Sequence, residues 1–202
     1  YSNTGQYGGG VYARRGGAII ASTIYSNVAE QSGGGVYMST EDSEDRAFVS
    51  NTTISGNRAF SAAGVDVASA GTEFTLRHAT IAYNQSNATA SNAPGGLIIA
   101  LGVDSGVNVT SLGGNLSADN SCGLTHATDQ VIGDPLLSPL QDNGGPTWTH
   151  ALAAGSPALD AGVIIHCLST DQRGVSRPQG AACDSGAYED EPAPAQQKLY
   201  LP

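Results

Sequence analysis

The stretch Gly8-Gly9-Gly10-Val11-Tyr12 decides the fold, because the chain repeats it. The same five residues return as Gly33-Gly34-Gly35-Val36-Tyr37, and diverged copies follow at residues 62–67 and 95–99. A second phrase, which ends in asparagine, runs between the copies at residues 22–27, 51–57 and 79–84. Whole phrases that recur every 20 to 50 residues indicate an architecture of stacked repeats.

The recurrence of whole phrases favours a parallel solenoid over a meander or sandwich, whose neighbouring strands would run antiparallel through tight turns. In a solenoid, equivalent residues of successive coils lie in columns. One interior column is predicted to contain Ile24, Ile54 and Ile81, and another Val11, Val36, Val65 and Leu97. Residues 18–24 and 74–81 alternate apolar with other residues, and each is predicted to form a half-buried strand.

The asparagines of the repeat are predicted to form a ladder along the stack. An Asn at a bend tolerates the left-handed backbone conformation, and stacked amides hydrogen-bond one another from coil to coil. The ladder is predicted from Asn3, Asn27, Asn57, Asn84 and Asn115.

The pattern of the chain changes at about residue 118. The following segments are dense in Gly, Pro, Asn and Asp, which favour turns over regular strands. Residues 1–117 are therefore predicted to form the coils, and residues 118–189 a loop-rich capping region that closes the last coil. Residues 190–202 read as a Pro/Ala linker with an extended tail. The predicted fold is all-β.

Charge and hydropathy restrict the partners of this chain of 202 residues, whose formal net charge is −10. An acidic chain is a poor match for nucleic acid or an anionic membrane surface, both of which attract Lys and Arg. No apolar run approaches the ~18 residues that a membrane-spanning helix requires. We therefore expect no nucleic-acid partner and no direct membrane span in this chain.

The cysteines point to an oxidising compartment. Cys167 and Cys183 lie in the turn-rich region and lack the Cys-x-x-Cys spacing of a zinc site. A disulfide between them is predicted, and it would stabilise the fold by roughly 3 kcal/mol on the chain-entropy model. Such a bond indicates an extracellular protein. Cys122 is predicted to be a small buried side chain.

The loop that follows the second Gly-Gly-Gly copy holds four acids: Glu41, Asp42, Glu44 and Asp45. Clustered carboxylates are the oxygen ligands that Ca²⁺ prefers, so calcium binding is one interpretation. The loop lacks the alternating Asp and the central Gly of an ordered calcium loop, so a solvated loop without any cofactor is the other.

The C-terminal third resembles the "choice-of-anchor Q" region of bacterial surface proteins. The shared phrases are Asp134-Pro135-Leu136-Leu137, residues 142–152, residues 155–162, residues 170–174, Arg177-Pro178 and residues 183–189. The region before it is similar to the right-handed parallel β-helices of polymorphic outer-membrane and adhesin proteins, with their Gly-Gly-Gly-Ile-Tyr and Ile-Ser-Gly-Asn repeats. This resemblance implies a secreted, non-enzymatic cell-surface β-helix, and Tyr200-Leu201-Pro202 is similar to the start of a sorting signal.

Three sets of side chains have both a functional and a structural interpretation. Enzymes on parallel β-helices use acids and Arg on one face, and the candidates are Asp66, Glu73, Arg77, His78 and Asp104. Tyrosines recur at Tyr7, Tyr12, Tyr25, Tyr37 and Tyr83, where they could bind glycans or protein, or simply stack. Asp160, Asp171, Arg173, Asp184 and Glu189 could form a binding site, or turns and buried ion pairs.

The function predicted from the sequence is structural or adhesive. One version is a filament or sheath subunit that self-associates head to tail, because a solenoid end is a template for strand addition. The assembly tail would be Lys198, Leu199, Tyr200, Leu201 and Pro202. The alternative is a β-helix that binds or degrades polysaccharide.

Overall fold

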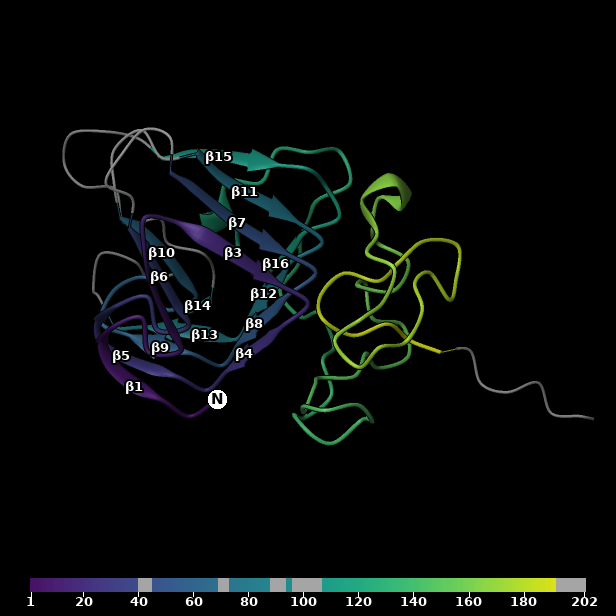
Figure 1. The fold of residues 1–202 in the computed structure, drawn as a ribbon, viewed down its shortest axis with the longest axis horizontal. Helices are drawn as coiled ribbons and strands as arrows, with labels where there is room; N and C mark the ends of the chain where they lie inside the picture. Colours follow the sequence, from purple (N-terminus) through teal and green to yellow (C-terminus); the bar gives the residue numbers. More distant parts are fainter. Residues whose placement is uncertain (40–44, 69–72, 88–93, 96–106, 192–202) are drawn as a thin grey trace, which may run out of the picture.

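The computed structural model describes residues 1–39, 45–68, 73–87, 94–95 and 107–191. Within these ranges the protein is all-β, without an α-helix, and its strands form four sheets (Figure 1). Every strand pair is parallel except one short pair. The described part of the chain contains no helix long and apolar enough to cross a membrane.

The four sheets contain the following strands. The first sheet has β1 (Thr4–Tyr7), β5 (Val28–Ser32), β9 (Arg58–Ala59), β13 (Asn84–Ser86) and the antiparallel β14 (Pro94–Gly95). The second has β2 (Val11–Arg14), β6 (Val36–Ser39) and β10 (Val65–Ala68). The third has β3 (Gly17–Ile20), β7 (Arg46–Ser50), β11 (Glu73–Arg77) and β15 (Asn108–Ser111). The fourth has β4 (Thr23–Tyr25), β8 (Thr53–Ser55), β12 (Thr80–Ala82), β16 (Leu116–Ser117) and β17 (Gln130–Val131).

The chain returns to each sheet once per coil, so β1, β5, β9 and β13 are neighbours, and the other sheets follow the same order (Figure 1). In-register pairing places Ile54 between Ile24 and Ile81, and all three are buried. In the same way Val36 lies between Val11 and Val65. Leu97, the expected end of that column, lies outside the described residues.

The two segments predicted as single strands, residues 18–24 and 74–81, are each divided by a corner. β3 ends before Ala21 and β11 ends before His78, and both corner residues have φ of 45°. Asn51 occupies the equivalent corner with φ of 47°. A left-handed residue turns the chain by a large angle, and the apolar alternation on each side hid this break.

The Gly-Gly-Gly phrase and the asparagine phrase recur together because they pack against each other inside the coil. A Cβ on Gly10 would lie 2.7 Å from Nδ2 of Asn27, and one on Gly35 would lie 2.9 Å from Nδ2 of Asn57. Such a separation is too short for a carbon, so glycine is required there. The side-chain amide of each Asn therefore occupies space that a side chain at the glycine position would need.

Four of the asparagines form a continuous row. Asn3 Nδ2 donates to Asn27 Oδ1 at 3.0 Å, Asn27 Nδ2 donates to Asn57 Oδ1 at 3.0 Å, and Asn57 Nδ2 donates to Asn84 Oδ1 at 2.9 Å. The backbone N–H groups of Asn3, Asn27 and Asn57 donate to the same oxygens. Each interior amide thus satisfies buried backbone and side-chain groups of the adjoining coil.

Asn115 was expected in this row and lies at a different corner. It precedes Leu116, which pairs with Thr80, so its equivalent in the previous coil is Ala79. Its Oδ1 accepts from the N–H of Ala79 at 2.9 Å, and its Nδ2 donates to Asp129 Oδ1 at 3.0 Å. The spacing of 31 residues from Asn84 concealed this shift, because a change of loop length moves a residue around the coil.

The loop-rich C-terminal region lies beside the fourth sheet, whereas the sequence suggested a lid over the last coil (Figure 1). Its contacts begin at the first coil, where Thr23 Oγ1 donates to Gln172 Oε1 at 2.7 Å. They continue on the second and third coils: Ser55 Oγ lies 3.0 Å from His150 Nε2, Thr53 Oγ1 accepts from the N–H of Ala187 at 3.0 Å, and Thr80 Oγ1 lies 3.1 Å from Ser185 Oγ. The outer face of this sheet carries small polar side chains. Because burying a polar group without a hydrogen bond is unfavourable, these side chains need the hydrogen bonds that the C-terminal region supplies. We call this region, residues 132–191, the lateral cap. The sheet also continues past residue 117, since β17 pairs with β16.

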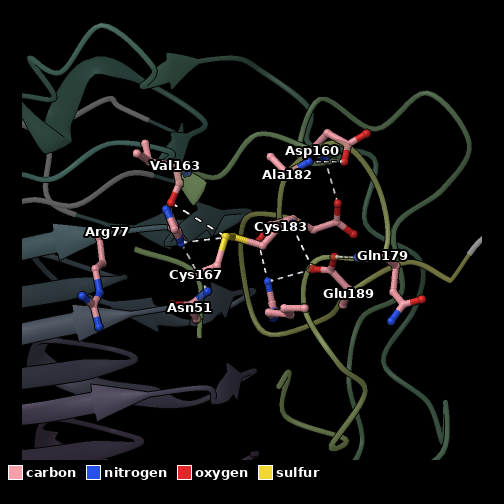
Figure 2. The surroundings of a disulfide bond; sticks show 12 residues. Asn51, Arg77, Asp160, Val163, Cys167, Gln179, Ala182, Cys183 and Glu189 are labelled. Carbon is pink, nitrogen blue, oxygen red and sulfur yellow. Dashed lines mark hydrogen bonds and ion pairs between the residues drawn. A yellow bond between two sulfur atoms is a disulfide. The ribbon is translucent and has the colours of Figure 1, made fainter. Parts of the chain in front are cut away.

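The predicted disulfide between Cys167 and Cys183 is confirmed, and it lies inside the lateral cap near the third sheet (Figure 2). Cys122 lies in the buried core of the coils, with its Sγ 3.0 Å from Ser117 Oγ. It belongs to a single turn of 3₁₀ helix, η1 (Asn120–Cys122). A second such turn, η2 (Ile164–His166), precedes Cys167.

Buried ion pairs hold the lateral cap together. Arg177 NH1 lies 3.1 Å from Glu189 Oε2, and both side chains are almost fully buried. Arg173 Nε lies 2.8 Å from Asp171 Oδ2, and its guanidinium covers the ring of Tyr188 at 3.7 Å. Asp171, Arg173 and Glu189 therefore form buried ion pairs, which was one of the two interpretations of these side chains.

His78 joins the coils to the lateral cap. The N–H of Val163 donates to His78 Nε2 at 2.8 Å, and His78 Nδ1 lies 3.7 Å from Cys183 Sγ. Burial, followed by the charges of Arg177 and Arg77, lowers the pKa of His78 from 6.5 to about 4. An Nε2 that accepts a hydrogen bond must be unprotonated, so the geometry requires the neutral imidazole.

We expect acidification to weaken this attachment. The lowered pKa of His78 contributes stability above pH 6.5, and the contribution falls as the pH drops from 6.5 to 4, by about 3 kcal/mol in total. Asp184 acts oppositely, because burial raises its pKa to about 6 and favours its protonated form in the folded state. The stability curve of the wild-type protein alone therefore mixes two opposing effects.

The variant His78→Asn isolates the histidine, since Asn tolerates the left-handed corner and retains Asp184. Urea unfolding of both proteins at pH 7, 5.5 and 4 should show the stability advantage of the wild type shrinking toward pH 4. A difference that stays constant over this range would contradict the assignment.

Candidate functional site

The outer face of the second sheet presents an aromatic row. Val36 and Met38 point into the core, so Tyr37 between them faces outward. Parallel pairing in register places Tyr12 on one side of Tyr37 and Asp66 on the other. The alternation of the strand and the repeat of the Gly-Gly-Gly-Val-Tyr phrase thus create this row directly.

A third tyrosine joins the row from the first sheet. The ring of Tyr37 stacks on Tyr12 with centroids 5.2 Å apart and planes 6° apart, and it meets Tyr7 at 5.0 Å with a tilt of 54°. The hydroxyl of Tyr7 donates to Gln31 Oε1. Stacked and tilted rings of this kind hold one another in place, which gives a rigid surface at low entropic cost on binding.

A groove of about 480 Å³ opens beside these rings, within the usual range for small-molecule sites. We call it the tyrosine groove. The described residues that line it are Tyr7, Glu30, Gln31, Ser32, Tyr37, Phe60, Ser61 and Asp66. Phe60 is 60% exposed, which is unusual for a phenylalanine and adds an apolar wall.

Ser32 gives the groove an unused polar group. Its side chain is 7% exposed, and its buried Oγ has no hydrogen-bond partner within the described structure. Buried hydroxyls are nearly always bonded, because an unsatisfied one costs about 1–3 kcal/mol.

The groove is acidic. Asp66 is buried and Glu30 is exposed, and the described lining contains neither Lys nor Arg. Burial, and then the charge of Asp66, raises the pKa of Tyr37, so its hydroxyl stays protonated at neutral pH. The described lining therefore combines aromatic rings that are neutral at neutral pH with two acidic residues, one of them exposed.

The five recurrent tyrosines do not form one row. Tyr25 lies under the lateral cap, where its ring meets His150 edge-on at 4.9 Å. The hydroxyl of Tyr83 donates to Asp134. These two rings contact the lateral cap, while Tyr7 and Tyr37 line the groove and Tyr12 stacks on Tyr37.

The predicted catalytic candidates are distributed over different elements. Asp66 lies in the groove, Glu73 forms an exposed ion pair with Arg46 in the third sheet, and His78 is the buried corner residue described above. Arg77 donates to Ser50 Oγ at 2.8 Å and covers the ring of Phe48. Asp104 lies outside the described residues.

The predicted calcium loop and assembly tail fall largely in undescribed parts of the chain. Glu41, Asp42 and Glu44 lie there, with Asp45 at the described edge, and so do Lys198, Leu199, Tyr200, Leu201 and Pro202. In the ranges that are described, no group of three or more His, Cys, Asp or Glu side chains could hold a metal ion.

Sequence reasoning missed Ser32, Glu30, Gln31 and Phe60 as groove residues. These residues directly precede the second and third copies of the Gly-Gly-Gly phrase. The available signal was Phe60 itself, which is one of only three Phe residues in the chain and lies between small side chains. The unpaired hydroxyl of Ser32 could not be read from the sequence, because it depends on the packing around it.

We expect Ser32→Ala to leave the free energy of unfolding unchanged or to raise it by about 1 kcal/mol, since it removes an unsatisfied buried hydroxyl. The matched control is Ser50→Ala. The Oγ of Ser50 donates to Asn51 and accepts from Arg77, so its loss should destabilise the protein by about 1–2 kcal/mol. Urea unfolding measures both. Equal losses in the two variants would mean that the Ser32 hydroxyl is bonded in solution.

Comparison of the chain with known protein families, with curated proteins and with solved structures yielded no match.

Proposed function

We propose that this chain is a non-enzymatic extracellular adhesive protein, in which a right-handed parallel β-helix displays the tyrosine groove to a surface polymer. The observation that carries the proposal is the groove itself, with its stacked rings on one outer face of a rigid stack. Exposed aromatic surface next to polar groups is typical of a binding site. The disulfide and the resemblance to choice-of-anchor Q bacterial surface proteins support an extracellular, cell-surface location.

Adhesion to immobilised polysaccharides and to cell-wall material tests this proposal. Protein-coated beads should be retained on at least one such surface, and Tyr37→Ala should release them. Tyr83→Ala is the matched control, because Tyr83 is also partly exposed at 40% but lies outside the groove. Equal retention by the Tyr37 and Tyr83 variants would place adhesion elsewhere on the molecule.

A polysaccharide-degrading enzyme is the second candidate, and one observation favours it. The groove contains two carboxyl groups, Glu30 and Asp66, and glycoside hydrolases use a pair of carboxyls. Release of reducing sugars from the polymer that the protein binds, abolished by Glu30→Gln, would establish this alternative. Retention without any sugar release supports the adhesive function.

A filament version of the adhesive proposal remains a prediction. It depends on the general property that the terminal coil of a solenoid carries strand edges. Unpaired strand edges are templates for addition of another chain, which here would be a second copy. Deletion of residues 190–202 should abolish any polymers seen by negative-stain microscopy. Intact filaments from the deletion variant would exclude the tail as the connecting element.

A further inference from the structure

We propose that Tyr12 and Tyr37 form an oxidative modification site, at which a haem peroxidase and hydrogen peroxide join the two rings through a carbon–carbon bond. The product is a dityrosine that links two adjacent coils covalently. The inference goes beyond the proposed adhesive function and does not depend on it. It rests on how the structure pairs the tyrosines and on which of them is exposed.

The repeat holds the two rings in contact. β2 and β6 pair in parallel register, with Tyr12 directly opposite Tyr37. The ring centroids are 5.2 Å apart and the ring planes differ by 6°. Tyrosyl radicals couple only when two rings meet, and a pair that is already positioned does not wait for a collision between molecules. The stacking therefore supplies the approach that this reaction needs.

This contact separates Tyr12 and Tyr37 from most other tyrosines. Within the described ranges, two tyrosine rings meet only here and where Tyr7 approaches Tyr37 at 5.0 Å. Tyr25 contacts a histidine of the lateral cap, and Tyr83 donates to an aspartate there. Coupling within one chain is therefore expected on the outer face of the second sheet.

Tyr7 is the competing partner of Tyr37. Its ring is tilted by 54° from that of Tyr37, it is half-buried, and its hydroxyl donates to Gln31. Tyr12 is 53% exposed, which gives its ring room to rotate toward Tyr37 during coupling. We therefore assign the bond to Tyr12 and Tyr37.

Exposure also decides where oxidation begins. The oxidant takes an electron from the exposed Tyr12, and the phenol releases its proton to water. Tyr37 is half-buried, but it can pass an electron to the Tyr12 radical across the stacked rings. A second oxidation of Tyr12 then leaves two radicals side by side.

The reaction balances with hydrogen peroxide as the oxidant. Each phenol loses one electron and one proton, and the two electrons and two protons reduce one hydrogen peroxide to two waters. The radicals couple at ring carbons next to the hydroxyls, and each of these carbons then passes its hydrogen to the ring oxygen. The chain loses two hydrogen atoms in total and gains one carbon–carbon bond.

Treatment of the full, folded chain with a haem peroxidase and hydrogen peroxide tests the assignment. We expect the blue fluorescence of dityrosine and a mass lower by two hydrogen atoms. The yield per chain should stay constant over an about tenfold range of protein concentration, because the coupling is intramolecular. Trypsin cleaves after Arg14, Arg15 and Arg46, so mass spectrometry should find residues 1–14 joined to residues 16–46 through Tyr12 and Tyr37.

The bond should also stabilise the stack. It closes a loop between two coils, as a disulfide would, and should raise the unfolding midpoint by about 5–10 °C. Thermal unfolding of the treated and untreated chains measures this shift. A midpoint that does not rise would overturn the stabilising role of the link.

Matched variants locate the reaction. Tyr12→Phe and Tyr37→Phe keep the ring but cannot form a phenoxyl radical, and each should lower the yield by at least about tenfold. Tyr83→Phe is the control, because Tyr83 is 40% exposed and lies apart from the pair, and its yield should equal that of the wild type. Circular dichroism verifies that each variant is folded. Treatment of the wild type in urea should abolish the preference for this pair, because unfolding separates the rings.

The other outcomes contradict the inference. Product that persists in Tyr12→Phe would assign the coupling to Tyr7 and overturn the proposed pair. Links mainly between chains, with a yield that rises with protein concentration, would show that the stacked pair is not the reacting one. Absence of dityrosine in the wild type would overturn the inference outright. None of these results bears on the adhesion assay, which tests the proposed function separately.

Discussion

Arg177→Met should lower the free energy of unfolding by about 3–5 kcal/mol, the usual loss when one partner of a buried ion pair is removed. The guanidinium donates to the carbonyl oxygens of Asp184 and Gly186 at 2.6 and 2.8 Å, and it pairs with Glu189 at 3.1 Å. Methionine would leave two carbonyls and a buried carboxylate without this partner. Urea unfolding monitored by Trp148 fluorescence, with Trp148 located in the lateral cap, measures the loss.

Two further variants make this prediction specific. Arg177→Met combined with Glu189→Gln should lose less than the sum of the single losses, because the second change removes the uncompensated charge. The exposed pair Arg46–Glu73, with side chains 63% and 55% exposed, is the control. Arg46→Met should cost less than about 1 kcal/mol. Similar losses for Arg177→Met and Arg46→Met would refute a structural role for the buried pair.

Asn57→Ala should destabilise the coils by about 3 kcal/mol or more. Asn57 Oδ1 accepts from both the backbone N–H and Nδ2 of Asn27, and its Nδ2 donates to Asn84 Oδ1 and the carbonyl of Ile24. Alanine leaves these buried groups unsatisfied at about 1–3 kcal/mol each, with some relief from rearrangement. Thermal and urea unfolding by far-ultraviolet circular dichroism measure the effect.

Asn3→Ala is the matched control for the asparagine row. Asn3 is the exposed first member and donates to Asn27, while water can replace its bonds. We expect a loss of less than about 1 kcal/mol there. If Asn57→Ala were as mild as Asn3→Ala, the row would be a consequence of the fold and would add little to its stability.

Several features were predictable from local patterns. The repeat phrases predicted parallel stacking and the columns of Ile24–Ile54–Ile81 and Val11–Val36–Val65. The position of Cys167 and Cys183 in the turn-rich region, without the spacing of a zinc site, predicted their disulfide. Each of these follows from a residue type that recurs in register or from a spacing within one region. The right-handed β-helix itself, the surface location and the adhesive role stay proposals.

Local sequence patterns did not predict which tyrosines come together at the groove. Tyr12 and Tyr37 were recognised as a recurring pair, and they do stack. Their grouping with Tyr7, and the separation of Tyr25 and Tyr83, depended on which side of the coil each repeat position occupies. An additional corner in a coil moves the residues that follow it to another side of the coil. The corners at Ala21 and His78 were not visible in the apolar alternation of the sequence.

The sequence by itself determined that equivalent residues stack, because the Gly-Gly-Gly phrase and the asparagine phrase recur together along the chain. Only the tertiary structure decided what lies against the outside of the stack. The lateral cap covers the face with Thr53, Ser55 and Thr80, and leaves the tyrosine face open. The physical reason is that repeats encode contacts between neighbouring coils, which recur along the chain. The cap binds through unrepeated contacts between residues about a hundred positions apart, and these leave no periodic signal.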